Sequence, residues 1–446
     1  MKKIFTLTML MGFCGLAQSQ NLADTAYAVR QETITPIHKT SFNNDGQCAE
    51  RKQGGNPQTI NGYMVFNGSM DGNRQVDPQI AVGGGYVLHG TNSGLVIYNK
   101  KGEFIQGVSQ KCFNDGIDPK MFFDIHNRVF VFDLWWYYDK PKTKPVNIAI
   151  TETDNPVAAW NIYPIPEPEE VDGGGIGYSK KWIGYSFPGG EQRTFVMRTS
   201  EAKAGKPAKT YHFNGTLGHP VFVQDDIEDM YFFEIDKQDI IIRKVTEGKG
   251  GEPISVLVAK EPHHLQYNDQ PSQSPQKGTA QKVSSGDRNP KALVYQNGSI
   301  WFSHVVNCEN RSAVQWHQVN GSTGKIVQTG LIKSDRYGYI QTTVTVNKNE
   351  DVVIGFQQTD STSFISPRFA YRKGKDKPGT VKDIINLGEG RGATDGASWG
   401  DYSGSIIDGD NLSDLWSVQS IANEKGRGET VIVKVPFSSK KKKKKK

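Results

Sequence analysis

The hydrophobic residues of the chain fall in short β-branched and aromatic runs, each ended by glycine, asparagine, aspartate or proline. Residues 79–109 are typical: apolar runs at 79–82, 86–89 and 95–99 are separated by a glycine-rich turn and an Asn-Ser-Gly turn. Such runs predict short antiparallel strands, and long apolar stretches with helical spacing are absent. The sequence therefore predicts an all-β protein.

The strand pattern recurs along the chain. Asp77-Pro78 opens one unit and Asp118-Pro119 opens the next, 41 residues later. Similar units open near residues 175, 220, 288, 339 and 399. Four-stranded units of about 40–50 residues are typical of propeller blades. Seven openings before residue 437 predict a seven-bladed β-propeller of four-stranded antiparallel blades, with a strand at 59–66 that closes the ring.

The N-terminus has the pattern of a secretory signal. Lys2 and Lys3 precede an apolar run at 4–16, and Ala17, Gln18 and Ser19 offer a cleavage site. The apolar run is shorter than the roughly 20 residues that a transmembrane helix needs. We therefore expect a secreted or periplasmic protein that does not insert into a membrane.

These features divide the chain into a signal peptide at 1–19, an N-terminal arm at 20–56, a propeller at 57–437 and a disordered lysine tail at 438–446. Seven tail lysines dominate the formal charge of +6, and without them and the two signal lysines the domain has a charge of −3. A run of like charges repels itself. A mildly acidic domain gives no reason to expect a nucleic-acid partner, and we expect a monomer.

Three cysteines follow the signal, at Cys48, Cys112 and Cys308, and none belongs to a C-x-x-C pair. Their spacing fits no common zinc pattern. In an oxidising compartment we expect one disulfide, between Cys48 and Cys112, and one buried thiol. The sequence has no metalloprotease, Walker or nucleophile-elbow motif, so we expect neither a cofactor nor a metal.

Four segments carry a resemblance to a known group. They are VDPQIAVGGGYVLHGTNSGLVIYNKKG from Val76, DPKMFFDIHNRVFVFDLW from Asp118, GDRNPKALVYQNGSIWFSHVV from Gly286 and WGDYSGSIIDGDNLSDLW from Trp399. These segments resemble secreted bacterial propellers of polysaccharide-degradation loci, which are similar to sialidase-like and ulvan-active propellers. The resemblance spans residues 76–416. It implies a propeller fold and β-elimination on uronic-acid-rich algal polysaccharide such as ulvan.

Residues at the openings of the repeats are expected to converge on the central channel of a propeller. These positions hold Asp77, Asp118, Arg288, Tyr337, Tyr339, Asp401 and Tyr402, and Arg74 and Asp395 lie nearby. Asp-Pro pairs are also good turn formers. For Asp77 and Asp118 the structural role is the favoured one.

Elimination from a uronate needs a cation at the carboxylate, a base for the C5 proton and an acid for the leaving oxygen. Arg288 suits the carboxylate through its bidentate fork. His89, Tyr185 and Tyr339 are the candidates for proton transfer. Arg74, Asn92, Asp401 and Tyr402 are the candidates for binding the substrate, an acidic oligosaccharide or polysaccharide.

Two other functions fit the same sequence. A glycosidase needs two carboxylates beside the scissile bond, and Asp118 with Asp401 would supply them. A non-catalytic propeller that binds carbohydrate or protein is favoured by the absence of any sharp catalytic motif. An elimination enzyme, a lyase or a dehydratase, is the leading hypothesis.

Overall fold

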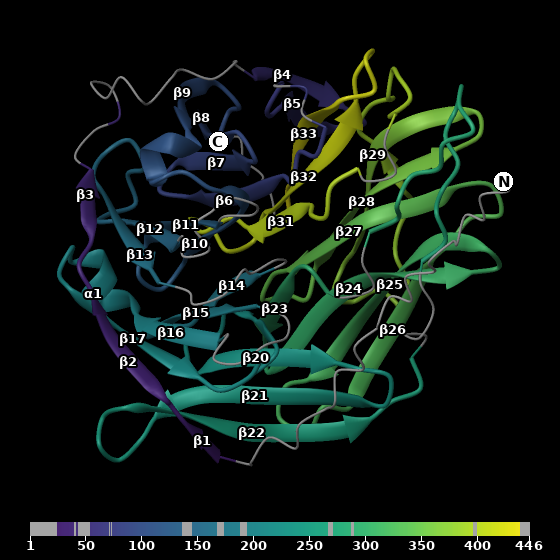
Figure 1. The fold of residues 1–446 in the computed structure, drawn as a ribbon. Helices are drawn as coiled ribbons and strands as arrows, with labels where there is room; N and C mark the ends of the chain where they lie inside the picture. Colours follow the sequence, from purple (N-terminus) through teal and green to yellow (C-terminus); the bar gives the residue numbers. More distant parts are fainter. Residues whose placement is uncertain are drawn as a thin grey trace, which may run out of the picture.

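The computed structural model describes residues 25–39, 42, 54–70, 72, 74–135, 145–166, 174–187, 194–265, 271–286, 290–395 and 399–437. The fold is all-β, as the alternation of apolar and turn residues predicted. Its antiparallel sheets stand around a common centre, and each presents a short first strand to that centre (Figure 1). The predicted signal peptide and lysine tail lie outside the described residues.

Two sheets follow each other directly. The first sheet is a meander of β6 (Gln79–Gly83), β7 (Tyr86–Thr91), β8 (Gly94–Asn99) and β9 (Phe104–Ser109). The second contains β10 (Ile117–Asp124), β11 (Val129–Trp135), β12 (Val146–Thr151) and β13 (Trp160–Ile165), with β3 (Ile37–Lys39) at its edge. A 3-10 helix, η1 (Gln110–Phe113), connects them.

A ten-stranded sheet holds two further meanders. One consists of β14 (Gly175–Tyr178), β15 (Trp182–Ser186), β16 (Thr194–Arg198) and β17 (Ala208–Phe213), with β2 (Arg30–Ile34) at its edge. The other consists of β23 (Leu293–Gln296), β24 (Ser299–Cys308), β25 (Arg311–Asn320) and β26 (Ile326–Ile332). The parallel strand β19 (Phe222–Val223) joins them. The helix α1 (Thr199–Lys203) lies between β16 and β17.

Three more sheets complete the molecule. One consists of β18 (His219–Pro220), β20 (Met230–Ile235), β21 (Asp239–Glu247), β22 (Pro253–Pro262) and β1 (Thr25–Tyr27). The next consists of β27 (Gly338–Val346), β28 (Val352–Asp360), β29 (Ser363–Arg372) and β30 (Ile385–Asn386). The last consists of β31 (Gly404–Ile407), β32 (Leu415–Ala422), β33 (Gly428–Val435), β5 (Tyr63–Asn67) and β4 (Gly55–Ile60).

The first strands of the sheets contact one another in a ring. β6 contacts β10, β10 contacts β14, and β14 contacts β18 and β19. The ring continues from β19 to β23, from β23 to β27, from β27 to β31 and from β31 back to β6. Sheets that surround an axis in this way are the arrangement of a β-propeller. The strand predicted at 59–66 is instead a hairpin of β4 and β5 with a turn at residues 61–62, and β5 pairs with β33 near the C-terminus.

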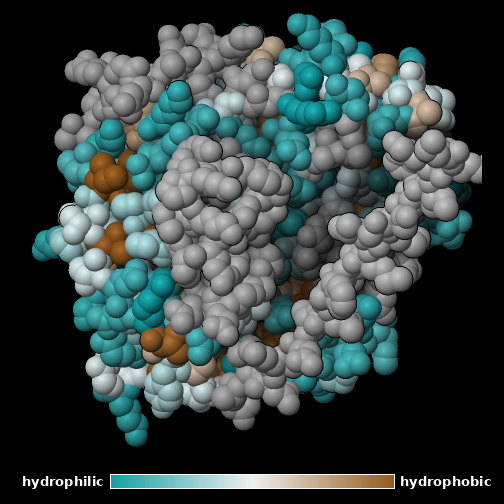
Figure 2. Space-filling model, viewed as in Figure 1, coloured by the Kyte–Doolittle hydropathy of each residue, from teal (hydrophilic) through white to brown (hydrophobic). Residues whose placement is uncertain are grey.

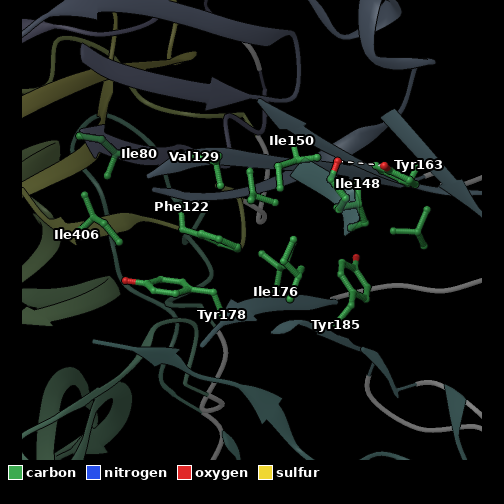
Figure 3. Packing of buried hydrophobic residues seen from close by; sticks show 14 of the residues in the cluster. Ile80, Phe122, Val129, Ile148, Ile150, Tyr163, Ile176, Tyr178, Tyr185 and Ile406 are labelled. Carbon is green, nitrogen blue, oxygen red and sulfur yellow. Dashed lines mark hydrogen bonds between the residues drawn. The ribbon is translucent and has the colours of Figure 1, made fainter. Parts of the chain in front are cut away.

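The core consists of apolar side chains packed between neighbouring sheets. Figure 3 shows Ile80, Phe122, Ile176 and Ile406 converging from β6, β10, β14 and β31. All four are at most 4% exposed. Burial of such side chains stabilises a fold by about 1.5–3 kcal/mol each. The core therefore holds the inner strands at the centre.

The N-terminal segment 25–39 runs along the outside of three successive sheets. Its strands β1, β2 and β3 pair antiparallel with the outer strands β22, β17 and β13, and they form the purple path in Figure 1. An unpaired edge strand is a template for aggregation. This segment therefore protects three sheet edges that would otherwise be open.

The face of the molecule in view is largely hydrophilic, and its hydrophobic residues form small separate patches (Figure 2). In the described residues, no helix is long and apolar enough to cross a bilayer.

Cys112 is disulfide-bonded and Cys308 is a free thiol. Cys48, the predicted partner of Cys112, lies outside the described residues, so that pairing stays a prediction.

Candidate functional site

A cavity lies at the starts of the inner strands. Its lining comes from β6, β10, β14, β18, β19, β23 and β31 and the residues next to them. The polar lining residues are Gln79, Lys120, His219, Lys291, Ser403 and Ser405. A smaller cavity shares Lys291 and is also lined by Gly286, His304, Val305, Gln341, Thr342 and Asp401.

Lys120 is the most unusual residue of this cavity. It is 6% exposed, and among the described residues its Nζ has no hydrogen-bond partner. The Nζ lies 2.9 Å from the centroid of the Tyr402 ring, a cation–π contact. Burial lowers the pKa of Lys120 to about 8, although the nearby carboxylates of Asp118 and Asp133 raise it. A buried ammonium without an acceptor is costly.

A second cation and a buried carboxyl complete this arrangement. Lys291 Nζ lies 5.1 Å from the Tyr402 ring, so the ring is shared by two ammonium groups. Asp133 on β11 is fully buried and accepts a 2.6 Å hydrogen bond from the backbone N–H of Lys120. Burial raises the pKa of Asp133 to about 7, against the charge of Lys120. We call Lys120, Asp133, Lys291 and Tyr402 the cavity cluster.

Carboxylates and an amide order the loops next to the cavity cluster. Asp77 accepts hydrogen bonds from the backbone N–H of Asp401 (2.5 Å) and from the Asn92 side chain (2.7 Å). Asn92 in turn accepts a 2.7 Å bond from the backbone N–H of Asp118. Burial, and then the charge of Asp401, raise the pKa of Asp77. The two Asp-Pro openings are thus joined to each other and to the Asp401-Tyr402 corner.

The backbone explains why these residues point inward. Asp77 and Asp118 have φ angles of +48° and +54°, in the left-handed region that few residues other than glycine adopt. The register of β10 shifts between Ile117 and Lys120, a bulge that redirects the strand. Gln341 has a φ of +52° at a similar irregularity in β27, and its side chain donates to the carbonyl of Gly400. Bulges with unusual dihedral angles are frequent next to functional sites.

A histidine pair lies behind the smaller cavity. His304 Nε2 lies 3.1 Å from His317 Nε2, and His317 Nδ1 lies 2.9 Å from Thr329 Oγ1. Burial, followed by the charge of His304, lowers the pKa of His317 well below its usual range. His317 is therefore neutral at physiological pH, and one ring donates the proton of the His304–His317 bond. His304 is the histidine that lines the cavity.

The structure brings together several residues that the sequence selected. Asn92, Asp401 and Tyr402 belong to the loops and ring at the cavity, with Asp77 and Asp118 beside them. The hydrogen bonds of Asp77 agree with the structural role expected for it.

Other selected residues lie apart from the cavity. Arg74 is 61% exposed in its side chain and lies 3.6 Å from Asp395. His89 is buried, with Nδ1 2.9 Å from the Gln79 carbonyl and Nε2 2.9 Å from Thr430 Oγ1. Tyr339 is 3% exposed and packs edge-on against Phe356.

Tyr185 and Arg288 need separate description. Tyr185 is fully buried, its ring is stacked 5.2 Å from that of Phe195, and it lines neither cavity. Arg288 lies outside the described residues, although Gly286 and Pro290 on either side of it line the two cavities.

Sequence reasoning did not find Lys120, Asp133, Lys291 or His304 as site residues. A signal exists for Lys120, because it is the one charged residue between Pro119 and Asp124 in an otherwise apolar strand. A lysine in a strand that is buried on both sides is seldom there for solubility. Among the described residues, no group of three or more histidine, cysteine, aspartate or glutamate side chains is arranged to hold a metal.

Comparison with known proteins gives structural likeness only. No family model matches the chain, and no curated protein matches it in sequence. Solved structures that resemble it include an ulvan lyase of polysaccharide lyase family PL25, at 11% identity and a TM-score of 0.32, covering 89% of this chain and 97% of that one.

Two other resembling structures have different functions. The WD40 domain of SCAP from fission yeast has 10% identity and a TM-score of 0.36, with 92% of this chain and 95% of that chain covered. A neuraminidase-like protein from the isolate A/little yellow-shouldered bat/Guatemala has 8% identity and a TM-score of 0.35, covering 66% of this chain and 94% of that one. These likenesses are too distant to support a function, so the argument for function rests on the cavity itself.

Proposed function

We propose that the protein is a carbohydrate-active enzyme that performs β-elimination on uronic-acid-containing oligosaccharides, such as those of ulvan, in the central cavity. One observation carries the proposal: two lysine ammonium groups share the ring of Tyr402 at the cavity, and one of them is buried without a hydrogen-bond acceptor. An anionic ligand supplies the missing acceptor. The partner is therefore an acidic oligosaccharide.

The two lysines meet the first requirement of elimination, a cation at the substrate carboxylate. A carboxylate held by Lys120 and Lys291 loses much of its negative charge, and the neighbouring C5 proton becomes more acidic. Charge stabilisation of this kind is worth several kcal/mol in a site that excludes water. Ser403, Ser405 and Gln79 line the same cavity and suit hydroxyl groups of a sugar.

Proton transfer is assigned to His304. It lines the smaller cavity, and Lys291 lines both cavities. An imidazole has a pKa near neutrality and suits a base or acid at physiological pH. His317 Nε2 lies within hydrogen-bond distance of His304 Nε2. Because the pKa of His317 is lowered, His317 stays neutral and orients the His304 ring without adding a second positive charge.

A glycosidase is less well supported than elimination. Of the two carboxylates that the sequence offers for a glycosidase, Asp401 lines the smaller cavity, whereas Asp118 lines neither of the two cavities. A non-catalytic binding propeller remains the second candidate, because the same lysine pair would bind an acidic sugar without chemistry.

The remaining sequence predictions extend the proposal. We propose seven blades, because the meanders that begin with β6, β10, β14, β18, β23, β27 and β31 each contribute four antiparallel strands around the centre. We further propose a monomer that is exported by a cleaved signal peptide and that acts without a cofactor.

The test is incubation of the protein with uronic-acid oligosaccharides from acidic algal polysaccharide. Elimination leaves a double bond conjugated with the carboxylate, and this product absorbs in the ultraviolet, whereas hydrolysis gives no such absorbance. We expect the absorbance to increase. Lys291→Ala should lower kcat/KM by about 100-fold, or about 2.7 kcal/mol.

Lys325→Ala is the matched control, because Lys325 is exposed in the turn between β25 and β26. It should leave kcat/KM unchanged. Binding of the oligosaccharides without any gain in absorbance would reject elimination and favour the binding propeller. New reducing ends without absorbance would favour a glycosidase.

A further inference from the structure

The Lys120 side chain differs from the other buried or half-buried lysines of the described chain. Lys100 contacts Asp408 and Asp410 at 2.5 Å each, and Lys244 lies 2.7 Å from Asp229. Lys120 is more deeply buried than either, yet its Nζ has no hydrogen-bond acceptor and its residue lines a cavity. A ligand bound in that cavity would supply the acceptor that this buried amine lacks.

We propose that Lys120 is a nucleophile that forms a reversible imine with the aldehyde or ketone carbon of a small oxo acid in the central cavity. This activity goes beyond the proposed elimination and does not depend on it. The class of ligand follows from the lining. Lys120 supplies the amine, and Lys291, which lines the same cavity, supplies a cation for the carboxylate.

The reaction balances without any other reagent. The neutral amine of Lys120 attacks the carbonyl carbon, a C–N bond forms, and the carbonyl oxygen becomes a hydroxyl by taking up a proton as the nitrogen loses one. The hydroxyl then leaves as water after a second proton transfer, and the nitrogen lone pair forms the C=N bond. The products are one imine and one water molecule.

The environment favours both steps. Burial lowers the pKa of Lys120 to about 8, so about a tenth of the side chain is neutral at pH 7, far more than for an exposed lysine. Desolvation next to another cation is a known way to activate a lysine for imine formation. Burial raises the pKa of Asp133 to about 7, so this carboxyl exchanges protons near neutrality.

Reductive trapping tests the proposal. The native protein is incubated with glyoxylate and cyanoborohydride, which reduces an imine to a stable carboxymethyl-lysine, and the modified lysines are located by mass spectrometry. We expect Lys120 to be modified at least ten times faster than the exposed Lys325 at pH 7. Glycolate, which has the carboxylate but no aldehyde, should give no product.

The pH dependence separates a reactive Lys120 from general surface labelling. Because only the neutral amine reacts, Lys120 trapping should rise with pH and level off above about 8, while Lys325 trapping should still rise beyond pH 10. Lys120→Arg keeps the charge and should remove this labelling at the cavity. Labelling of Lys120 no faster than that of Lys325 in the native protein would overturn the proposal. That result would leave the elimination assay unaffected.

Discussion

The two ends of the inner strands handle charge in opposite ways. At the end where the hairpins turn, Lys100, Arg128, Asp408 and Asp410 form what we call the hairpin cluster, in which each charge has an opposite partner. Asp410 lies 2.5 Å from Lys100 and 3.0 Å from Arg128, and it accepts the backbone N–H groups of Gly84 and Gly85. At the other end, Lys120 of the cavity cluster is buried with no hydrogen-bond acceptor among the described residues, and burial is the largest influence on its pKa and on that of Asp133.

The pKa values express the same contrast. Burial raises the pKa of Asp410, but the hydrogen bonds from Lys100, Gly85 and Arg128 outweigh it and hold this pKa well below its usual range. In the cavity cluster burial wins, so Lys120 titrates near 8 and Asp133 near 7. The hairpin cluster therefore stabilises the fold, whereas the cavity cluster costs stability. Perturbed pKa values beside a cavity are what make the cavity cluster the candidate site for binding or chemistry.

The largest expected effect is on the cavity cluster. Asp133→Asn keeps the oxygen that accepts the Lys120 N–H but removes the buried charge. Because the pKa of Asp133 is raised in the folded state, ionisation costs the wild type stability as pH rises from about 4 through 7. The variant should be more stable than the wild type at pH 8, on the order of 4 kcal/mol, and the difference should vanish near pH 4.

Urea denaturation at both pH values measures this difference. An equal difference at pH 8 and pH 4 would show that Asp133 carries no burial cost.

The hairpin cluster should respond with the opposite sign. Asp410→Ala removes an acceptor from two turn N–H groups and a counter-ion from two cations, so we expect a loss of about 3 kcal/mol in the free energy of unfolding. Asp410→Asn should lose less, because its amide oxygen still accepts. If Asp410→Ala unfolds at the same urea concentration as the wild type, the hairpin cluster does not stabilise the ring.

A smaller effect is expected for Lys120→Met, which fills similar space without charge. Replacing a buried charge with a well-packed apolar group is often stabilising, and we expect a gain of about 2 kcal/mol at pH 7. The depressed pKa of Lys120 means that the wild type gains stability as pH rises from 8 to 10.5, so the gain of the variant should shrink over that range. Thermal or urea unfolding at pH 7 and pH 10 tests this, and a destabilised variant at both would contradict it.

Much of the fold follows from the sequence because strand alternation and turn residues are local signals. The two Asp-Pro openings lie at the starts of β6 and β10, whereas the strand predicted at 59–66 is a hairpin whose second strand, β5, pairs with β33. The number of blades is harder to predict. Short strands such as β18 and β19 carry two residues each, too few for a pattern to appear in the sequence.

The site is only partly visible in the sequence. Asp401 and Tyr402 were selected because they open a repeat, and openings converge at the axis. Lys120 was not, because the bulge at Ile117 to Lys120 decides which way its side chain faces. His89 shows the converse: it lies near an opening, yet its β7 strand turns it toward Thr430 in the last sheet. The alternation of side chains along a strand assigns each residue to one of two faces. It does not indicate which of the two faces lines the cavity.

Calorimetric titration with a uronic-acid oligosaccharide tests most directly whether the cavity cluster is kept for an anionic ligand. A carboxylate beside Lys120 raises its pKa, so binding at pH 8 should take up about half a proton, seen as a dependence of the binding enthalpy on buffer ionisation. Lys120→Met should bind without proton uptake, and a neutral oligosaccharide of the same length should bind at least tenfold more weakly. Equal affinity for the neutral and acidic sugars, with no proton uptake by the wild type, would contradict this account.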